Sequence, residues 1–136
     1  MEQSTIEEVR VRFARDEFAT KCLGAVIDRY DCETGEAQVS MTIDNRHHNG
    51  QGFIMGGVFF SLSDFALAVA GNMNQPPTSS VSSSIQYLRR AKGKRLIAKA
   101  RPDKLGRNLA FITVDVYDEL GTHCTRMVAT MARTDH

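Results

Sequence analysis

The feature that most constrains this chain is the apolar segment Val58–Ala70, in which Asp64 is the one charged residue. Paired glycines precede the segment and Gly71 follows it, as expected for a helix that ends at glycine. A helix that is apolar on nearly every side has to be buried on nearly every side. The segment is too short to span a membrane, so the rest of the chain has to cover it.

The segments on either side of this helix have the patterns of β-strands. Residues 37–43 alternate between apolar and polar side chains, as a strand with one buried face does. Strands are expected over residues 21–30, 37–43, 81–88, 96–100, 110–116 and 122–133. Short turns join the last four, which favours an antiparallel sheet with the apolar helix packed against it. The predicted class is α+β, an antiparallel sheet wrapped around one long central helix.

The N-terminal segment predicts a further helix. Thr5 and Glu8 have the spacing of a capping box ahead of Val9, Phe13 and Phe18. A chain of 136 residues has the size of one domain with one core. No repeat, linker or low-complexity stretch divides it, so we expect a single domain over residues 1–136.

Charge and cysteine content exclude several classes of protein. The formal net charge is +1 and no basic stripe alternates with aromatic residues, so nucleic-acid binding is not expected. Cys22, Cys32 and Cys124 are odd in number and widely spaced, which favours reduced thiols over a disulfide framework or a metal site. Residues 1–12 lack an apolar signal core. We expect a cytoplasmic protein with no membrane segment and no metal.

One ordered set of residues resembles the signature of the hot-dog thioesterases, in particular the PaaI-like group of the phenylacetate pathway. That signature usually reads N-x5-H-G-G-x2-F-x-L-x-D. The matching residues here are Asn49, Gly56, Gly57, Phe60, Leu62 and Asp64. Further similar segments are Leu23-Gly24, residues 87–93, Gly106-Arg107 and residues 115–121. The chain departs from the family at Met55, where histidine is usual, and at Arg90, where proline is common.

The resemblance implies a fold, an activity and an assembly. The fold is the hot dog, and the activity is hydrolysis of an acyl-CoA thioester to a free acid and CoA. No separate cofactor is implied, because CoA is part of the substrate. These enzymes build two equivalent sites across a two-fold homodimer, and a tetramer of two such dimers is common among them.

Asp64 and the glycines before the helix are the first candidates for catalysis. A carboxylate in an apolar helix is either paired, placed at an interface or active, as general base or as nucleophile. Gly56 and Gly57 would present bare backbone N–H groups at the helix start, which suit a developing oxyanion. The same glycines would also permit tight packing of the helix start.

The spacing of these groups limits how they can cooperate. Asp64 lies eight residues after Gly56, which is about 12 Å along a helix that rises about 1.5 Å per residue. One carboxylate cannot reach a carbonyl group held at the start of its own helix. If both groups act on one substrate, Asp64 has to come from a second subunit.

The remaining candidates each have a plainer alternative. Asn49 would position the water or the thioester, or it is an Asn-Gly turn residue. Ser82 would support Asp64 or the attacking water, or it belongs to an ordinary strand surface. Arg89 and Arg107 would bind the phosphates of CoA, or they lie in solvated turns. The substrate-binding residues expected from the resemblance and its surroundings are Met55, His48, Phe60, Arg89 and Arg107.

Three other functions stay open from the sequence. A non-catalytic acyl-CoA-binding protein on the same fold is the main alternative, because methionine at position 55 cannot replace the hydrogen bonds of a histidine. A hot-dog hydratase would pair an aspartate with a histidine, and the central helix contains no histidine. A structural protein would use Asp64 only as a polar group at an interface.

Overall fold

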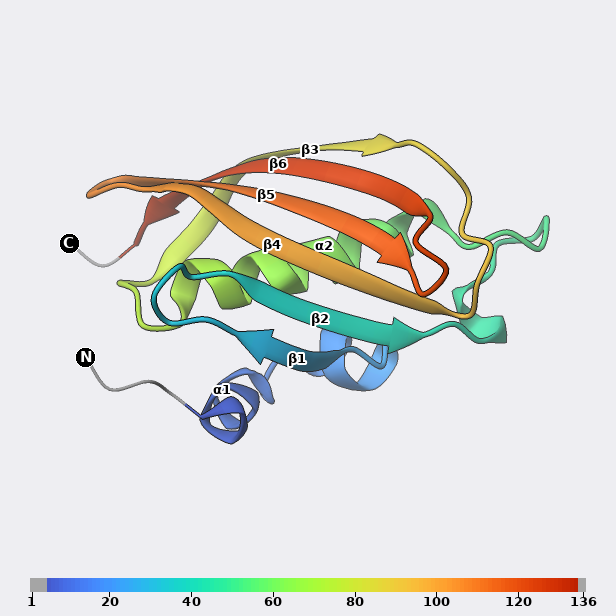
Figure 1. Cartoon of the computed structure of the whole chain (residues 1–136), viewed down its shortest axis with the longest axis horizontal. Coiled ribbons are helices and arrows are strands. Elements are labelled where there is room, and N and C mark those ends of the chain that lie inside the picture. The colour runs from blue at the N-terminus through green and yellow to red at the C-terminus, as the bar shows by residue number, and fades with distance from the viewer. Residues whose placement is uncertain (1–4, 135–136) are drawn as a thin grey trace.

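The computed structural model describes residues 5–134, in which six strands form one antiparallel sheet (Figure 1). The strand order is β1-β2-β4-β5-β6-β3. The strands are β1 (Val26–Tyr30), β2 (Ala37–Thr42), β3 (Thr78–Tyr87), β4 (Arg95–Leu105), β5 (Leu109–Asp118) and β6 (His123–Arg133). The helices are α1 (Ile6–Phe13), the π-helical turn η1 (Phe18–Cys22), the 3-10 turn η2 (Asn45–His47) and α2 (Gly56–Asn72).

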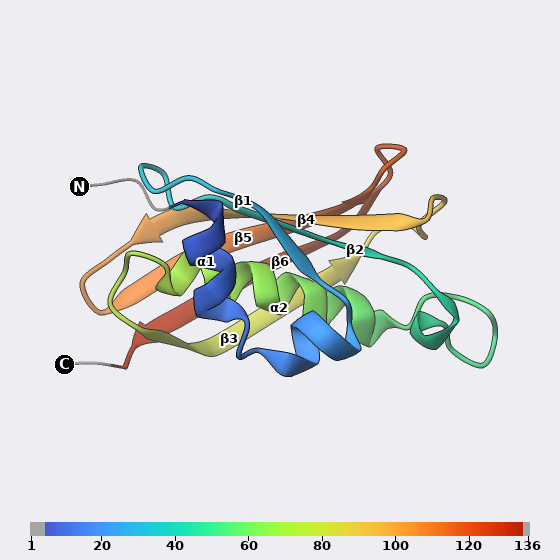
Figure 2. The same cartoon turned by 90° about the horizontal axis from the view of Figure 1, so that it is seen from below.

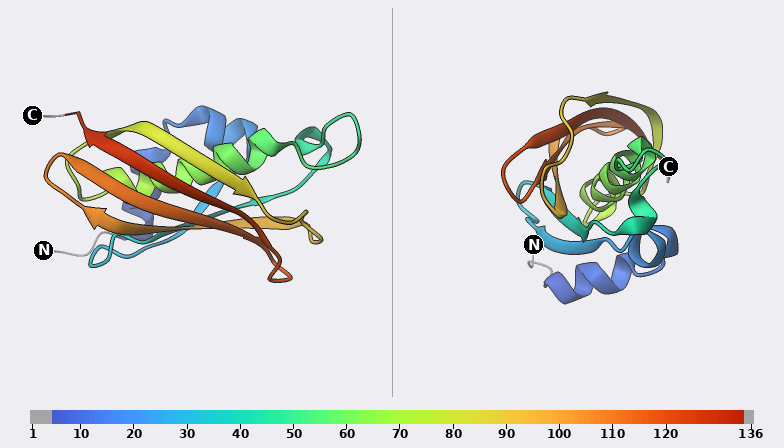
Figure 3. Two further views of the ribbon diagram at one scale, coloured as in Figure 1. Left: turned by 90° about the horizontal axis from the view of Figure 1, so that it is seen from above. Right: turned by 90° about the vertical axis from the view of Figure 1, so that its right-hand side faces the viewer.

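The sheet curls around α2, which lies in its concave face (Figure 3). Register explains how alternation in sequence builds the core: Val39 pairs with Ala98, which pairs with Val116, and all three are fully buried. Side chains one residue away point to the outer face. The predicted α+β class, with its antiparallel sheet and long central helix, is confirmed.

Helix α2 is buried on most of its surface, but one stripe is open. Ten of its residues are buried, among them Leu62 and Ala66. Three residues, Gly57, Phe60 and Asp64, are exposed. Because they are three and four residues apart, they lie on one face of the helix and form the open stripe. The single chain therefore leaves one face of this helix exposed.

The predicted N-terminal helix is present but shorter than its apolar pattern indicated. The Thr5 hydroxyl accepts a hydrogen bond from the backbone N–H of Glu8 at 3.2 Å, as the capping-box pattern predicts. The helix ends at Phe13, whose ring packs edge-on against Phe65 of α2. Phe18 is 64% exposed and belongs to the next turn instead. Figure 2 shows α1 and that turn in front of α2.

The first strand begins later than predicted. Residues 18–22 form the π-helical turn η1, so the expected strand from Lys21 was wrong in its first half. Gly24 follows the turn with φ of +82°, a left-handed conformation that favours glycine and ends a helical turn. The Leu23-Gly24 pair is therefore the end of a helical turn that precedes β1.

Candidate functional site

A pocket of about 570 Å³ lies at the N-terminus of α2. Its wall comes from the loop before α2, the end of β3 and the residues that follow β3. It includes the candidates His48, Asn49, Gly56 and Arg89, with Phe59 and Tyr87 as its apolar side. Two segments that are far apart in the sequence, residues 43–59 and 87–93, therefore meet around the first turn of the central helix.

The two glycine amides at this helix start have no acceptor among the described residues. Val58 N–H bonds to the carbonyl of Met55 at 2.9 Å, whereas no bond is found for the N–H of Gly56 or Gly57. Met55 is the N-cap residue and its side chain makes no capping hydrogen bond. Unpaired N–H groups at a helix start carry partial positive charge and suit an anionic oxygen.

Tyr87 fixes the position of this helix start, a contact that the sequence analysis did not predict. Its hydroxyl donates a hydrogen bond to the carbonyl of Gly56 at 3.0 Å, and its ring packs edge-on against Phe59. A Cβ on Gly56 would lie 3.2 Å from the Tyr87 hydroxyl. Glycine at position 56 thus allows the tyrosine to lie directly on the helix start.

Asn49 organises the loop that forms one wall of the pocket. Its Oδ1 accepts hydrogen bonds from the N–H groups of Gln51 at 3.0 Å and Phe53 at 3.1 Å. This is the turn role expected as the plainer alternative for Asn49. Its amide nitrogen makes no hydrogen bond among residues 5–134 that would prevent it from contacting a ligand.

The two loop histidines differ in their availability. His47 is 2% exposed, with Nδ1 accepting from the Asp44 N–H and Nε2 lying 3.1 Å from the Leu23 carbonyl. It is a structural residue and does not replace the missing histidine at position 55. His48 is exposed and lines the pocket, with Nδ1 lying 2.9 Å from the carbonyl of Asp44.

Arginine is the only charged residue type that lines this pocket among the described residues. Arg89 and Arg90 contribute the charge, and no carboxylate is present in the wall. Arg107 lies in the turn between β4 and β5, at the end of the molecule opposite to the start of α2 (Figure 1). Within one chain, the structure therefore brings Arg89 to the candidate site but not Arg107.

Asp64 lies in a different hollow, of about 510 Å³, together with Phe60 and the residues around η1. It is exposed and makes no hydrogen bond or ion pair within residues 5–134. Partial desolvation and the charge of Asp16 raise the pKa of this carboxyl above its ordinary value. Gly56 and Asp64 line separate hollows of one chain, as their separation along α2 requires.

The register places Ser82 away from α2. Ser82 pairs with Thr130, whereas Ser80 and Ser83 pair with the core residues Met131 and Ala129. A register irregularity between Ser80 and Ser82 produces this change of face. The structure does not bring Ser82 together with Gly56 or Asp64.

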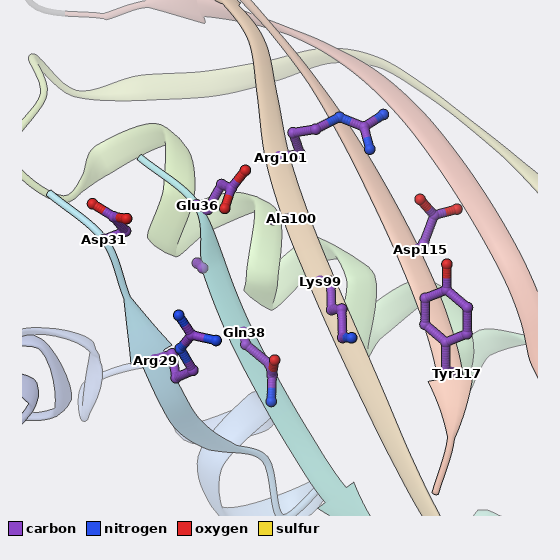
Figure 4. Close-up of a pocket in the computed structure, with 10 residues that line it drawn as sticks. Arg29, Asp31, Glu36, Gln38, Lys99, Ala100, Arg101, Asp115 and Tyr117 are labelled. Carbon is purple, nitrogen blue, oxygen red and sulfur yellow. The ribbon is translucent and has the colours of Figure 1, made fainter. Parts of the chain in front are cut away.

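A third hollow, of about 270 Å³, lies on the outer face of the sheet (Figure 4). Its carboxylate Asp115 is already bonded, with Arg126 Nε at 2.8 Å and His123 Nε2 at 2.7 Å. Burial opposes ionisation, but these partners hold the pKa of Asp115 below its ordinary value. The same wall contains three basic side chains, Arg29, Lys99 and Arg101, and three acidic ones, so the hollow has no dominant charge.

The part of the chain that the structure describes contains no metal-binding cluster and no membrane-spanning helix. Among residues 5–134, no three His, Cys, Asp or Glu side chains are grouped so that they would hold a metal ion. Within the same residues, no helix has the length and apolar character needed to cross a membrane.

Comparison with known proteins identifies the family. Residues 51–125 match the model of the thioesterase superfamily, which is more than half of the chain, so the chain belongs to that superfamily. A candidate esterase of Archaeoglobus fulgidus is 32% identical over 87 residues, which cover 63% of this chain and 56% of that relative. The chain thus spans little more than half the length of this curated relative.

Solved structures agree with this assignment. A variant of the phenylacetic acid degradation protein PaaI from Thermus thermophilus is 28% identical, with a TM-score of 0.77 over 85% of this chain and 97% of that one. A hypothetical thioesterase of Streptococcus pneumoniae, solved with coenzyme A, is 23% identical, with a TM-score of 0.82 over 92% and 96%. The resemblance to PaaI-like hot-dog thioesterases is confirmed.

Proposed function

We propose that this protein is an acyl-CoA thioesterase whose two sites are completed across a homodimer. The observation that carries the proposal is the pair of unpaired amides of Gly56 and Gly57 at the start of α2, where the adjoining pocket contains arginine and no carboxylate. Membership of the thioesterase superfamily supports the reaction class. The coenzyme A present in the Streptococcus pneumoniae structure supports the leaving group.

The proposed reaction begins with the thioester carbonyl at the start of α2. The N–H of Gly56, assisted by that of Gly57, donates to the carbonyl oxygen and stabilises the oxyanion. Asp64 of the partner subunit removes a proton from water as the water oxygen attacks the carbonyl carbon. Collapse of the tetrahedral intermediate breaks the C–S bond, and the proton returns from Asp64 to the CoA thiolate. In the alternative, the Asp64 carboxylate attacks the carbonyl carbon itself, the C–S bond breaks with release of the CoA thiolate, and water then hydrolyses the resulting mixed anhydride to the free acid.

The open stripe of α2 and the edge of the sheet support a shared site. Asp64 and Phe60 are exposed on that stripe in the single chain. Strand β3 is a sheet edge with mostly exposed side chains, and an unpaired edge invites pairing with another chain. A second copy docked along β3 and this stripe would cover Asp64. A tetramer of two such dimers and a cytoplasmic location stay predictions.

Roles for the remaining residues follow from where they lie. Arg89 contacts a phosphate of CoA, and the Asn49 amide positions the water or the thioester, because both line the pocket of Gly56. Phe60 contacts the acyl group next to Asp64. Arg107 would bind a phosphate at this pocket only if the β4–β5 turn of a neighbouring subunit lay next to the pocket.

A non-catalytic acyl-CoA-binding protein is the second candidate. The observation that favours it is Met55, which is 56% exposed at the N-cap and offers no hydrogen bond there. Such a protein would bind acyl-CoA with the same pocket and would release no thiol.

Free-thiol release from a panel of acyl-CoAs tests the proposal. Asp64→Asn removes the base or nucleophile, and Gly56→Pro removes one N–H donor at the first helical position, where proline is tolerated. Met55 already has ψ of 137°, a conformation that a following proline accepts. Asp64→Asn and Gly56→Pro are expected to lose turnover by about 100-fold or more, whereas Asp28→Asn, on β1, is expected to keep it. Because any Cβ at position 56 would lie 3.2 Å from the Tyr87 hydroxyl, Gly56→Ala, which adds the Cβ but keeps the N–H, is the control for crowding and is expected to lose less turnover than Gly56→Pro. A wild-type protein that binds acyl-CoAs but releases no thiol would contradict the proposal in favour of the second candidate.

A further inference from the structure

The mouth of the candidate pocket is bridged by one contact between two loops. The guanidinium carbon of Arg90 lies 3.8 Å from the centroid of the Phe53 ring. Phe53 belongs to the loop before α2, and Arg90 belongs to the segment between β3 and β4. At this distance the guanidinium is in van der Waals contact with the ring face, which is the geometry of a cation–π pair.

The loop that carries Phe53 is itself held in place. Asn49 N–H bonds to the carbonyl of Phe53 at 2.7 Å, and the Asn49 side chain accepts from the Phe53 N–H. His48 and Ile54 form an isolated antiparallel bridge across the same loop. The Phe53 ring is therefore a positioned platform, so Arg90 loses less side-chain entropy when it binds a ligand.

The stacked guanidinium keeps its hydrogen-bonding edge available. Arg90 is exposed and makes no hydrogen bond or ion pair with a carboxylate among residues 5–134. Arg89, the adjacent residue, is the other charged group in the pocket wall. Two arginines in a pocket wall that contains no carboxylate among residues 5–134 suit a phosphate group, because each guanidinium can donate two parallel hydrogen bonds to it.

We propose that Arg90, held on the Phe53 ring, binds a phosphate of the nucleotide part of CoA and so makes the enzyme selective for full CoA thioesters over shorter pantetheine thioesters. This inference rests on the proposed function and deepens it. Arg90 is a specificity determinant, because it lies in the pocket wall beside Arg89 and is positioned by the Phe53 ring. It acts on substrate binding and takes no part in the chemistry at the carbonyl group.

The test compares two thioesters of one neutral acyl group, carried by CoA and by pantetheine. In Arg90→Ala, kcat/KM for the acyl-CoA is expected to fall about tenfold through KM, with the pantetheine thioester changed less than about twofold. Phe53→Leu keeps the arginine but removes the platform, and a smaller loss of about threefold on the acyl-CoA alone is expected. Arg12→Ala, an exposed arginine of α1, is the matched control and should change neither.

Three outcomes distinguish the two proposals. Equal losses on both thioesters, or none on either, would overturn the role of Arg90 and leave the thioesterase proposal standing. An effect of Arg90→Ala that appears only with acyl groups bearing a carboxylate would assign the arginine to the acyl end and overturn the phosphate role. If the wild-type protein cleaves neither thioester, calorimetric affinity for CoA against pantetheine still tests Arg90, and an unchanged ratio in Arg90→Ala would overturn its role.

Discussion

Substitution of Asp118 has an effect on the stability of the fold that can be worked out from the structure. Its carboxylate is 2% exposed and accepts four backbone hydrogen bonds. Oδ2 accepts from Lys92 at 2.7 Å and Gly93 at 3.0 Å, and Oδ1 accepts from Leu120 at 3.0 Å and Thr122 at 2.8 Å. This one side chain therefore joins the loop at the rim of the candidate pocket to the β5–β6 turn.

Asp118→Asn keeps the shape of the side chain and removes half of its acceptors. In either orientation the new amide NH2 faces two backbone N–H groups that have lost their acceptor. A hydrogen bond to a charged group contributes about 1.5–3 kcal/mol. Because the turn can relax towards water, we expect the lower end of this range for each of the two lost hydrogen bonds, which gives a total loss of about 3 kcal/mol in the free energy of unfolding.

The pH dependence of this loss is a second readout. Burial opposes ionisation of Asp118, but the amide hydrogen bonds from Lys92, Thr122 and Gly93 lower its pKa from 3.8 to about 2. A depressed folded-state pKa stabilises the fold above the unfolded value, and that stability is lost as pH falls through the folded value. The difference between wild type and Asp118→Asn should be full at pH 6 and should shrink between about pH 4 and pH 2.

Urea denaturation at fixed protein concentration measures both effects, with Asp28→Asn as the matched control. The control carboxylate on β1 makes no hydrogen bond among the described residues and should change the unfolding free energy by less than about 0.5 kcal/mol. A loss under about 1 kcal/mol in Asp118→Asn at pH 6, or a difference that persists unchanged to pH 2, would refute the reasoning.

Two further predictions concern titration and thiol reactivity. Desolvation and the nearby charge of Asp16 raise the pKa of Asp64 above its ordinary value of 3.8, so kcat/KM should fall on the acid side at a pH above that value. In Asp16→Asn this acid limb of the pH profile should move to lower pH, and a limb that does not move would contradict the prediction. Burial raises the pKa of Cys124 to about 11, so this thiol should react with a disulfide reagent at pH 8 only after unfolding. Exposed Cys22 and half-buried Cys32 should react first, and three fast thiols in the native protein would contradict the buried position of Cys124.

The fold could be predicted because its periodicities are local. Apolar alternation identified the inner faces of β2, β4 and β5, and the glycine-bounded apolar run identified α2. The predicted strand over residues 21–30 was wrong at residues 21–25, which include Gly24. The left-handed φ of Gly24 instead ends a helical turn, and short sequence patterns do not distinguish these two uses of glycine.

The parts of the candidate site that could be predicted from the sequence are those that lie within one helix. Gly56 and Gly57 follow from the helix start, and the separation of Asp64 from them follows from helix geometry. The contact from Tyr87 joins positions that are 31 residues apart, and no local pattern indicates it. The face on which Ser82 lies could not be predicted from the sequence, because one register irregularity in β3 changes the face of each following side chain.

A mixed dimer tests the shared site most directly. Asp64→Asn and Gly56→Pro subunits carrying different affinity tags are refolded together, and the heterodimer is isolated and assayed for thiol release. One of its two sites would combine an intact Gly56 with an intact Asp64 from the other subunit, so we expect about half of the wild-type activity per dimer. A heterodimer as inactive as both parent homodimers would contradict the account, because each chain would then need its own glycine and its own aspartate.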